Sequence, residues 1–285
     1  MVNRAAAGVA AQPRGKARWA MVEWLLYLAA GTGAGLLAGL FGVGGGIVMV
    51  PLLYFAFRSQ GFAAATLFQC ATATSLAAII ASGLSALAAH GRRHNVDWRP
   101  AGLLALGAAL GAAAVASWAV ARPGAGWRVC FGLFLWSAAW LVSRRPHPAT
   151  RVAPPYPATG RWLAIGLASG ALSAAFGVGG GVVAVPLMGV LLHVEFRRAV
   201  GNATAVLASS AIISTAVYLV AGQQWIATSH ASLGLIHLPS AVALALAATP
   251  AAQVGGWLAH RLPERLLRTL FVALLLLTGG GMVLG

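Results

Sequence analysis

Acidic residues are scarce in this chain. Four Asp and Glu residues stand against 19 Lys and Arg, which gives a formal net charge of +15 at pH 7, and charged residues of both signs make up only 8% of the 285 residues. Apolar residues make up 60%, more than a soluble domain could bury, so the composition excludes that class and indicates a multi-pass membrane protein. The basic residues lie between apolar runs and lack an aromatic-rich reading face, which favours lipid headgroups over nucleic acid as their partner.

Cysteines are also few, and titratable groups are rare inside the apolar runs. Cys70 and Cys130 both fall within apolar segments, which argues against a disulfide framework or a metal site built on them. No Asp or Glu lies in the middle of an apolar run, so the usual carboxylate relay for proton coupling is missing and the coupling mechanism stays open. His193 and His237 lie near segment ends, as interfacial residues do. Because the sequence has no nucleophile with a neighbouring base and no cluster of metal ligands, we expect no enzyme activity, metal or cofactor.

The chain repeats itself. Residues 31–52 and 166–187 share 13 identities in 22 positions, including Phe-Gly-Val-Gly-Gly-Gly and the Val-Pro-Leu that follows it. Residues 71–79 align with 199–207 at an offset of 128, and a third match lies near the end of each half at an offset of 140. We therefore divide the chain into a basic N-terminal tail (1–18), a first transmembrane repeat (19–142), a Pro/Arg-rich linker (143–160) and a second transmembrane repeat (161–285).

Each repeat contains five apolar segments. We expect all of them to be helical, because the helix is the only open-chain structure that spans lipid. The sequence thus predicts an all-α polytopic integral membrane protein. The segments are 19–41, 47–57, 62–89, 101–121 and 127–142 in the first half, and 162–176, 182–194, 199–221, 232–260 and 266–284 in the second.

The segments that flank each glycine motif are short. Residues 162–176 would form a helix of about 22 Å, against a hydrocarbon core of about 30 Å. Each motif is therefore predicted to be the tip of a broken-helix hairpin, followed by about three membrane-spanning helices, and the two repeats would have inverted topology. Basic residues split 12 to 7 between the two sides in this arrangement and 11 to 8 in a parallel one. The positive-inside rule thus favours inversion slightly, and the membrane orientation stays open.

The glycine motifs are the strongest functional signal. Consecutive glycines allow positive φ and let a ligand approach the main chain, and the helix that restarts after them offers free N–H groups and the positive end of its dipole. A small anion is the natural occupant of such a site. A purely structural role in close helix packing is the alternative, but matching glycine interruptions in both halves favour a binding site. The predicted residues are Gly44, Gly45, Gly46, Gly179, Gly180 and Gly181.

Polar residues on the next helix of each half complete the predicted site. Hydroxyl and amide groups can donate hydrogen bonds to an oxyanion without carrying charge, although ordinary interhelical hydrogen bonding is an equal alternative for each residue. Gln253 is a weaker candidate of the same kind. The predicted substrate-binding residues are Gln69, Thr72, Thr74 and Ser75 in the first half, and Asn202 and Thr204 in the second.

These motifs resemble those of the TauE/SafE family of sulfite exporters and sulfonate permeases. The resemblance runs from about Trp19 to Leu284 and rests on "GLLAGLFGVGGGIVMVPLL", "ALSAAFGVGGGVVAVPLM" and "ATATSL". It implies transport of small sulfur-containing anions, such as sulfite, sulfoacetate or other organosulfonates, across the bacterial cytoplasmic (inner) membrane, often as export. It also implies that both glycine motifs sit near the substrate. The second half departs from the family pattern, because Asn202 in "AVGNAT" stands where a threonine is expected.

The predicted function is therefore anion transport by alternating access around the paired glycine hairpins. A carrier for another small anion, such as a carboxylate, is the first alternative. An intramembrane enzyme or a structural membrane subunit is the second. The predicted partners are the anion and the lipid bilayer, and the substrate, direction and oligomeric state stay open.

Overall fold

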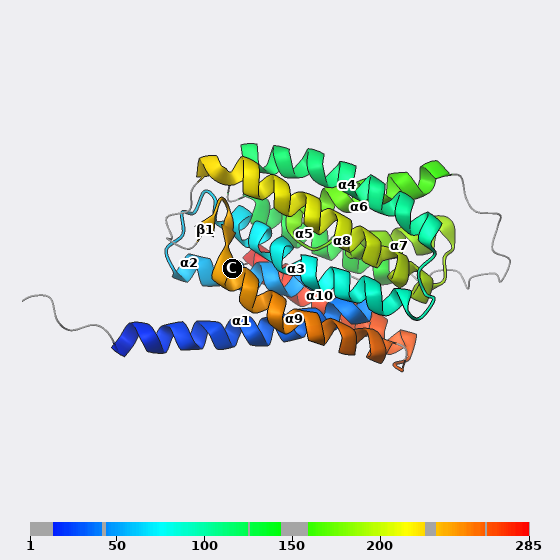
Figure 1. Ribbon diagram of the computed structural model, residues 1–285, viewed down its shortest axis with the longest axis horizontal. Helices are drawn as coiled ribbons and strands as arrows, with labels where there is room; N and C mark the ends of the chain where they lie inside the picture. The colour runs from blue at the N-terminus through cyan, green and yellow to red at the C-terminus, as the bar shows by residue number, and fades with distance from the viewer. Residues whose placement is uncertain are drawn as a thin grey trace, which may run out of the picture.

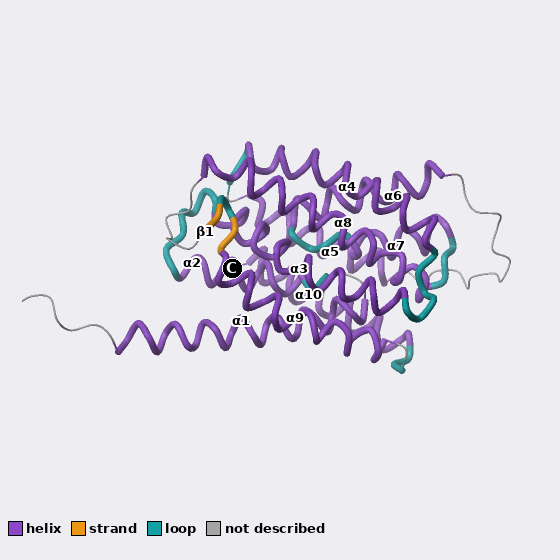
Figure 2. The backbone as a smooth tube through the Cα atoms, viewed as in Figure 1, coloured by secondary structure: helices purple, strands orange, loops and turns teal. Residues whose placement is uncertain are grey.

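The computed structural model describes residues 14–41, 44–124, 126–143, 159–225, 232–259 and 261–284. Within them the chain is almost entirely helical, as Figure 2 shows, which confirms the predicted all-α membrane class. Residues 1–13 of the predicted tail and residues 144–158 of the predicted linker lie outside this description. The helix that follows the tail begins at Arg14, five residues before the predicted Trp19.

The first half contains five helices. They are α1 (Arg14–Phe41), α2 (Gly46–Ser59), α3 (Leu67–Gly91), α4 (Trp98–Ala121) and α5 (Gly126–Ser143). The second half contains α6 (Thr159–Phe176), α7 (Gly181–Leu192), α8 (Phe196–Ala221), the short 3₁₀ helix η1 (Gly222–Trp225), strands β1 (Ser232–Leu233) and β2 (Ile236–His237), α9 (Leu238–Ala259) and α10 (Glu264–Leu284). Figure 1 shows the helices lying side by side as one bundle.

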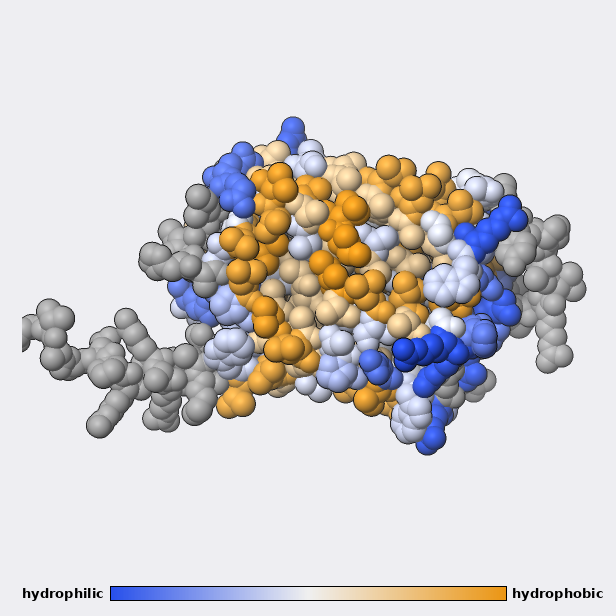
Figure 3. Space-filling model, in the orientation of Figure 1, coloured by the Kyte–Doolittle hydropathy of each residue, from blue (hydrophilic) through white to orange (hydrophobic). Residues whose placement is uncertain are grey.

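Among the residues that the structure describes, six helical stretches are long and apolar enough to cross a membrane. They are Trp24–Phe41, Leu67–Gly91, Trp98–Ala121, Gly126–Ser143, Phe196–Gln224 and Leu238–Leu258, and α2, α7 and Thr269–Leu284 are shorter apolar helices. Figure 3 shows a broad apolar surface across the middle of the bundle, with hydrophilic residues gathered toward its two ends. This is the surface expected of a protein that spans a bilayer.

Two predicted helical segments were wrong at their start. In the segment 62–89 the helix α3 begins only at Leu67, and residues 62–66 form a loop and a turn. Residues 232–260 begin with a two-stranded hairpin, in which Ser232 pairs with His237 and Leu233 with Ile236, and α9 starts only at Leu238. Gly234 has φ 57°, which suits the first central position of a tight two-residue turn, and Pro239 lies in the first helical turn, where its missing N–H costs no hydrogen bond. The apolar run therefore contains a turn before the helix.

Small residues bring helices from different halves into contact. Gly35 of α1 lies against Ala248 of α9, and Gly170 of α6 lies against Ala108 of α4; a Cβ on either glycine would overlap the facing carbonyl oxygen. These contacts correspond to one another, because Gly35 and Gly170 are 135 residues apart and Ala108 and Ala248 are 140 apart, the offsets of the repeat. Each half therefore packs its first helix on the fourth helix of the other half.

Corresponding helices of the two halves pack antiparallel. In α3 and α8, Gly83 lies near Leu207, with 3.1 Å between a built Cβ and the leucine Cγ, whereas the carbonyl of Asn95, beyond the end of α3, lies against Gly201 near the start of α8. In α5 and α10, Gly132 approaches Val283, and the Trp136 indole donates to the carbonyl of Leu276 at 3.3 Å. These two pairs of corresponding helices thus run antiparallel in the bundle.

Candidate functional site

Each glycine motif forms a turn in the left-handed region between two helices. In the first motif Gly44 has φ 86° and Gly45 has φ 65°; in the second, Gly179 has φ 82° and Gly180 has φ 71°. Gly45 and Gly180 are the residues that precede α2 and α7, so each helix restarts directly after a backbone conformation that L-residues rarely adopt. The repeated glycines are therefore required by the backbone.

The two turns meet at the centre of the molecule. A Cβ on Gly46 would overlap the carbonyl oxygen of Gly177, and one on Gly44 would lie 3.1 Å from the carbonyl oxygen of Val178. The glycines from 44 to 46 and from 179 to 181 are all buried. The predicted pairing of the motifs is therefore present in the structure, and in this conformation the turns are in direct contact, with no room for a side chain between them.

Helix α3 brings polar side chains to the second turn. The Ser75 hydroxyl donates to the carbonyl of Gly177 at 3.0 Å, and a Cβ at Gly177 would lie 3.1 Å from Thr72 Cα. Thr72 is fully buried, and its Oγ1 has no hydrogen-bond partner. Gln69 lies one helical turn earlier on the same face and is 1% exposed, and neither its Nε2 nor its Oε1 has a partner.

Unpartnered polar groups of this kind are unusual in a protein interior. A buried polar atom without a hydrogen bond costs about 1–3 kcal/mol, so each needs an explanation such as a water or a ligand. Thr72 offers a hydroxyl beside the second turn, which the N-terminus of α7 follows, and Gln69 offers an amide one helical turn away on the same face of α3. Together these groups can bind a small anion through neutral donors and a helix dipole.

Ser169 is a site residue that the sequence interpretation missed. It lies on α6, is fully buried, and its Oγ has no hydrogen-bond partner. Its carbonyl oxygen would lie 3.1 Å from a Cβ on Gly180, so Ser169 borders the second turn. Its counterpart at the first turn is Ala34, which meets Gly45 in the same way. This substitution of Ser for Ala between aligned positions was the one available signal.

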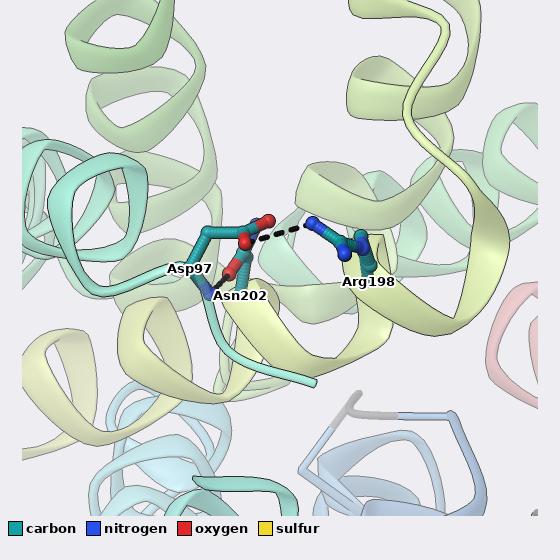
Figure 4. Close-up of polar contacts among 3 residues, drawn as sticks. All are labelled: Asp97, Arg198 and Asn202. Atoms are coloured by element: carbon teal, nitrogen blue, oxygen red, sulfur yellow. Dashed lines mark hydrogen bonds and ion pairs between the residues drawn. The ribbon is translucent and has the colours of Figure 1, made fainter. Parts of the chain in front are cut away.

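The other predicted residues lie elsewhere or are already paired. The Thr204 hydroxyl donates to the carbonyl of Gly201 at 2.6 Å, within its own helix. The Asn202 Oδ1 accepts the backbone N–H of Asp97 at 2.8 Å, and Arg198 contacts the Asp97 carboxylate at 3.0 Å (Figure 4). Asn202 thus holds the start of α4, and its amide oxygen is not available at the glycine turns.

Thr74 plays the corresponding part in the first half. Its Oγ1 accepts the backbone N–H of His237 at 3.0 Å, just before α9. Thr74 and Asn202 are aligned in the repeat. Each of these side chains therefore fixes the start of the fourth helix of the other half. The His237 ring contacts Ser240 at 2.7 Å and packs edge-on against Phe57, and its burial lowers the pKa of the imidazole below the ordinary value.

The family of the chain follows from comparison with known proteins. The profile of the sulfite exporter TauE/SafE family matches residues 27–282. The chain belongs to this family. It is 26% identical to a "Probable membrane transporter protein" of Haemophilus influenzae over 91% of this chain and 98% of the relative. It is 24% identical to "Probable membrane transporter protein MJ0441" of Methanocaldococcus jannaschii, over 88% of this chain and 91% of that relative.

Other relatives carry the same kind of name. The "Probable membrane transporter protein YunE" of Bacillus subtilis is 26% identical over 70% of this chain and 80% of the relative. No solved structure matches the chain. This TauE/SafE protein is a multi-pass membrane transporter of the cell inner membrane, and the predicted resemblance is confirmed.

Proposed function

We propose that this TauE/SafE protein carries a small sulfur-containing anion, namely sulfite, sulfoacetate or another organosulfonate, and exports it. The anion would bind where the two glycine turns meet and be exposed to each side in turn. The observation that carries the proposal is that Thr72, beside the second turn, and Gln69, one helical turn away on the same face of α3, are buried with unpaired polar atoms. Ser169 adds a third residue with an unpaired polar atom, a hydroxyl next to the same turn.

The chemistry of these groups suits an anion that must also be released. A hydrogen bond from a neutral donor to a charged acceptor contributes about 1.5–3 kcal/mol, so two or three of them bind without trapping the ligand. The proposed set contains no Lys or Arg, whose fixed charge would hold an anion more strongly. Because the turns touch in this conformation, binding requires them to separate, and the movement that separates them would be part of the alternating-access cycle.

The antiparallel packing of α3 with α8 and of α5 with α10 supports inverted repeats. In that arrangement the two halves present the glycine turns from opposite sides of the membrane. The repeat boundaries 19–142 and 161–285 and the membrane orientation belong to the same proposal. Transport of a small carboxylate by the same site is the alternative, since carboxylates accept hydrogen bonds from the same donors.

Flux in proteoliposomes tests the proposal. We expect wild-type protein to release labelled sulfite or sulfoacetate faster than empty vesicles, and Thr72→Val to reduce that flux about tenfold through loss of one hydrogen bond to the anion. Removing an unpaired buried hydroxyl should leave the thermal midpoint unchanged or higher, so the transport loss could not be attributed to misfolding.

Thr215→Val is the matched control. Thr215 lies on α8 and also has a buried Oγ1 without a partner, but it is far along the helix from the turns. Its replacement should raise or preserve stability and leave flux intact. If the wild-type protein moved acetate but neither sulfite nor sulfoacetate, the sulfonate assignment would be wrong. If Thr72→Val transported at the wild-type rate, the position of the site would be wrong.

A further inference from the structure

An open groove lies on the outside of the bundle, where α3 ends and α4 begins. It has a volume of about 490 Å³ and is lined by Leu84, Leu87, Ala88, Gly91, Arg92 and Trp98. Leu84 is 47% exposed and Trp98 is 66% exposed, so the groove opens to the surroundings of the protein. Leu84 and Arg92 are eight residues apart, about 12 Å along the helix, which is close to the depth of one leaflet of the hydrocarbon core.

The groove is apolar along its length and charged at one end. Four aliphatic or small residues of α3 form its wall, and the exposed Arg92 lies at the last turn of that helix. Trp98 packs against Gly91, with 3.3 Å between a built Cβ and the indole ring. An exposed tryptophan beside an arginine at a helix end is typical of the membrane interface, where the headgroups lie.

No acidic side chain neutralises Arg92 in the part of the chain that the structure describes. The nearest carboxylate in sequence, that of Asp97, is paired with Arg198 at 3.0 Å. The neighbouring Arg93 donates to the carbonyl of Gly256 at 2.8 Å and is thereby directed toward α9. Arg92 is therefore the charged group of the groove that is available to a ligand.

The second half provides an internal comparison. At the repeat offset of 128, Arg92 corresponds to Val220, and Leu84 and Ala88 correspond to Ile212 and Ala216. Val220 is 73% exposed and Ile212 is 42% exposed, so the equivalent surface faces outward too but carries no charge. Both surfaces expose apolar residues, but only the surface of the first half has a cation, Arg92, at its end.

We propose that the α3/α4 groove is a binding site for an anionic phospholipid. An acyl chain would lie along Leu84, Leu87 and Ala88, the phosphate would contact Arg92, and Trp98 would lie at the level of the glycerol backbone. The ligand is identified by this combination of an apolar wall within one leaflet and an unpaired cation at its edge. The proposal is independent of the transported anion.

Native mass spectrometry of the full-length protein tests the site, with phosphatidylglycerol and phosphatidylcholine of identical acyl chains as probes. We expect phosphatidylglycerol to bind roughly fivefold more tightly than phosphatidylcholine, the effect of one arginine near a headgroup. Arg92→Gln should remove this preference and leave the binding of phosphatidylcholine unchanged. Ala88→Trp fills the groove and keeps the charge of Arg92, so it should weaken the binding of both lipids.

Arg161→Gln is the control for general surface charge. Arg161 is exposed at the start of α6, and it lies at the same end of the bundle because Gly166 of α6 packs against Leu104 of α4. This variant should keep the preference for phosphatidylglycerol. The proposal is overturned if Arg161→Gln and Arg92→Gln weaken binding equally, if the wild-type protein does not distinguish the two lipids, or if Ala88→Trp binds both as the wild type does.

Discussion

At the scale of single residues, the glycines of the two motifs serve two separable purposes. Gly45 and Gly180 need positive φ, and Gly46 needs the absence of a side chain because Gly177 is in contact with it. Gly61 shows the first requirement alone, since its φ is 80° and nothing lies within 4 Å of a Cβ built there. Comparing these positions separates backbone strain from close packing.

We predict that Gly45→Ala destabilises the protein much more than Gly61→Ala. The left-handed conformation costs an L-residue about 1–2 kcal/mol at either position, but at Gly45 the new methyl would also overlap the carbonyl of Ala34. Thermal unfolding of the purified variants in detergent measures the difference. Equal shifts of the thermal midpoint would show that the turn tolerates a side chain and that the contact is loose.

At the scale of elements, the bundle is held by close contacts between helices of different halves. Glycines of α1 face α9, and glycines of α6 face α4, with backbone against backbone. Such contacts require small residues, because van der Waals packing rather than the hydrophobic effect joins helices within a bilayer. The sequence has glycines four residues apart in these helices, a spacing typical of close packing, but only the structure identified the partner helices.

Two neighbouring glycines of α1 give a matched test. A methyl at Gly35 would overlap the backbone of Ala248, whereas nothing lies within 4 Å of a Cβ built at Gly33. We expect Gly35→Ala to lower the thermal midpoint and Gly33→Ala to raise it slightly, because alanine is better than glycine in a helix by up to about 1 kcal/mol. If Gly35→Ala were as stable as Gly33→Ala, α1 and α9 would not pack as closely as described.

The β1–β2 hairpin gives the protein a pH-dependent element. Burial lowers the pKa of His237 from its ordinary value of 6.5, so the folded protein binds this proton less readily than the unfolded chain does. As the pH falls, His237 is therefore protonated first in the unfolded chain. Its contribution to the free energy of unfolding is complete above about pH 7, and it is lost as the pH falls through 6.5 toward the folded pKa.

We accordingly expect the thermal midpoint to drop between about pH 7.5 and about pH 5.5, and His237→Gln to reduce that drop. The exposed His94 provides the control: His94→Asn, which suits its φ of 55°, should retain the wild-type pH dependence. Identical pH profiles for the wild type and His237→Gln would mean that other groups determine the acid sensitivity.

At the scale of the whole molecule, the two halves are fixed to each other at both ends of the bundle. Asn202 of the second half accepts the Asp97 N–H of the first, and Thr74 of the first half accepts the His237 N–H of the second. These contacts are equivalent under the repeat. They explain why the aligned polar pair, which the sequence interpretation assigned to substrate, lies away from the turns.

The orientation of the halves can be measured with introduced cysteines. Ser59 is the last residue of α2 and lies near the start of α3. Glu195 precedes α8, whose start lies near the end of α3, and both residues are exposed. Since α3 has 25 residues and is about 37 Å long, the inverted arrangement predicts that the two positions lie on opposite sides of the membrane. In a background with Cys70→Ala and Cys130→Ala, we expect an impermeant maleimide to label Ser59→Cys and Glu195→Cys from opposite sides. Labelling from the same side would exclude inverted repeats.

The sequence by itself determined the class of protein, the duplication and the two glycine turns. Apolar runs in lipid can only be helices, and a glycine run that recurs before a proline at matching positions of both halves indicates a break, so these conclusions need no knowledge of neighbours. The tertiary structure decided which polar residues meet the turns. Thr72 and Thr74 are two residues apart, about 200° around a helix, so one borders Gly177 and the other reaches His237. The alignment of Ser169 with Ala34 is visible in the sequence, but only the contact of α6 with Gly180 places this hydroxyl at the turn.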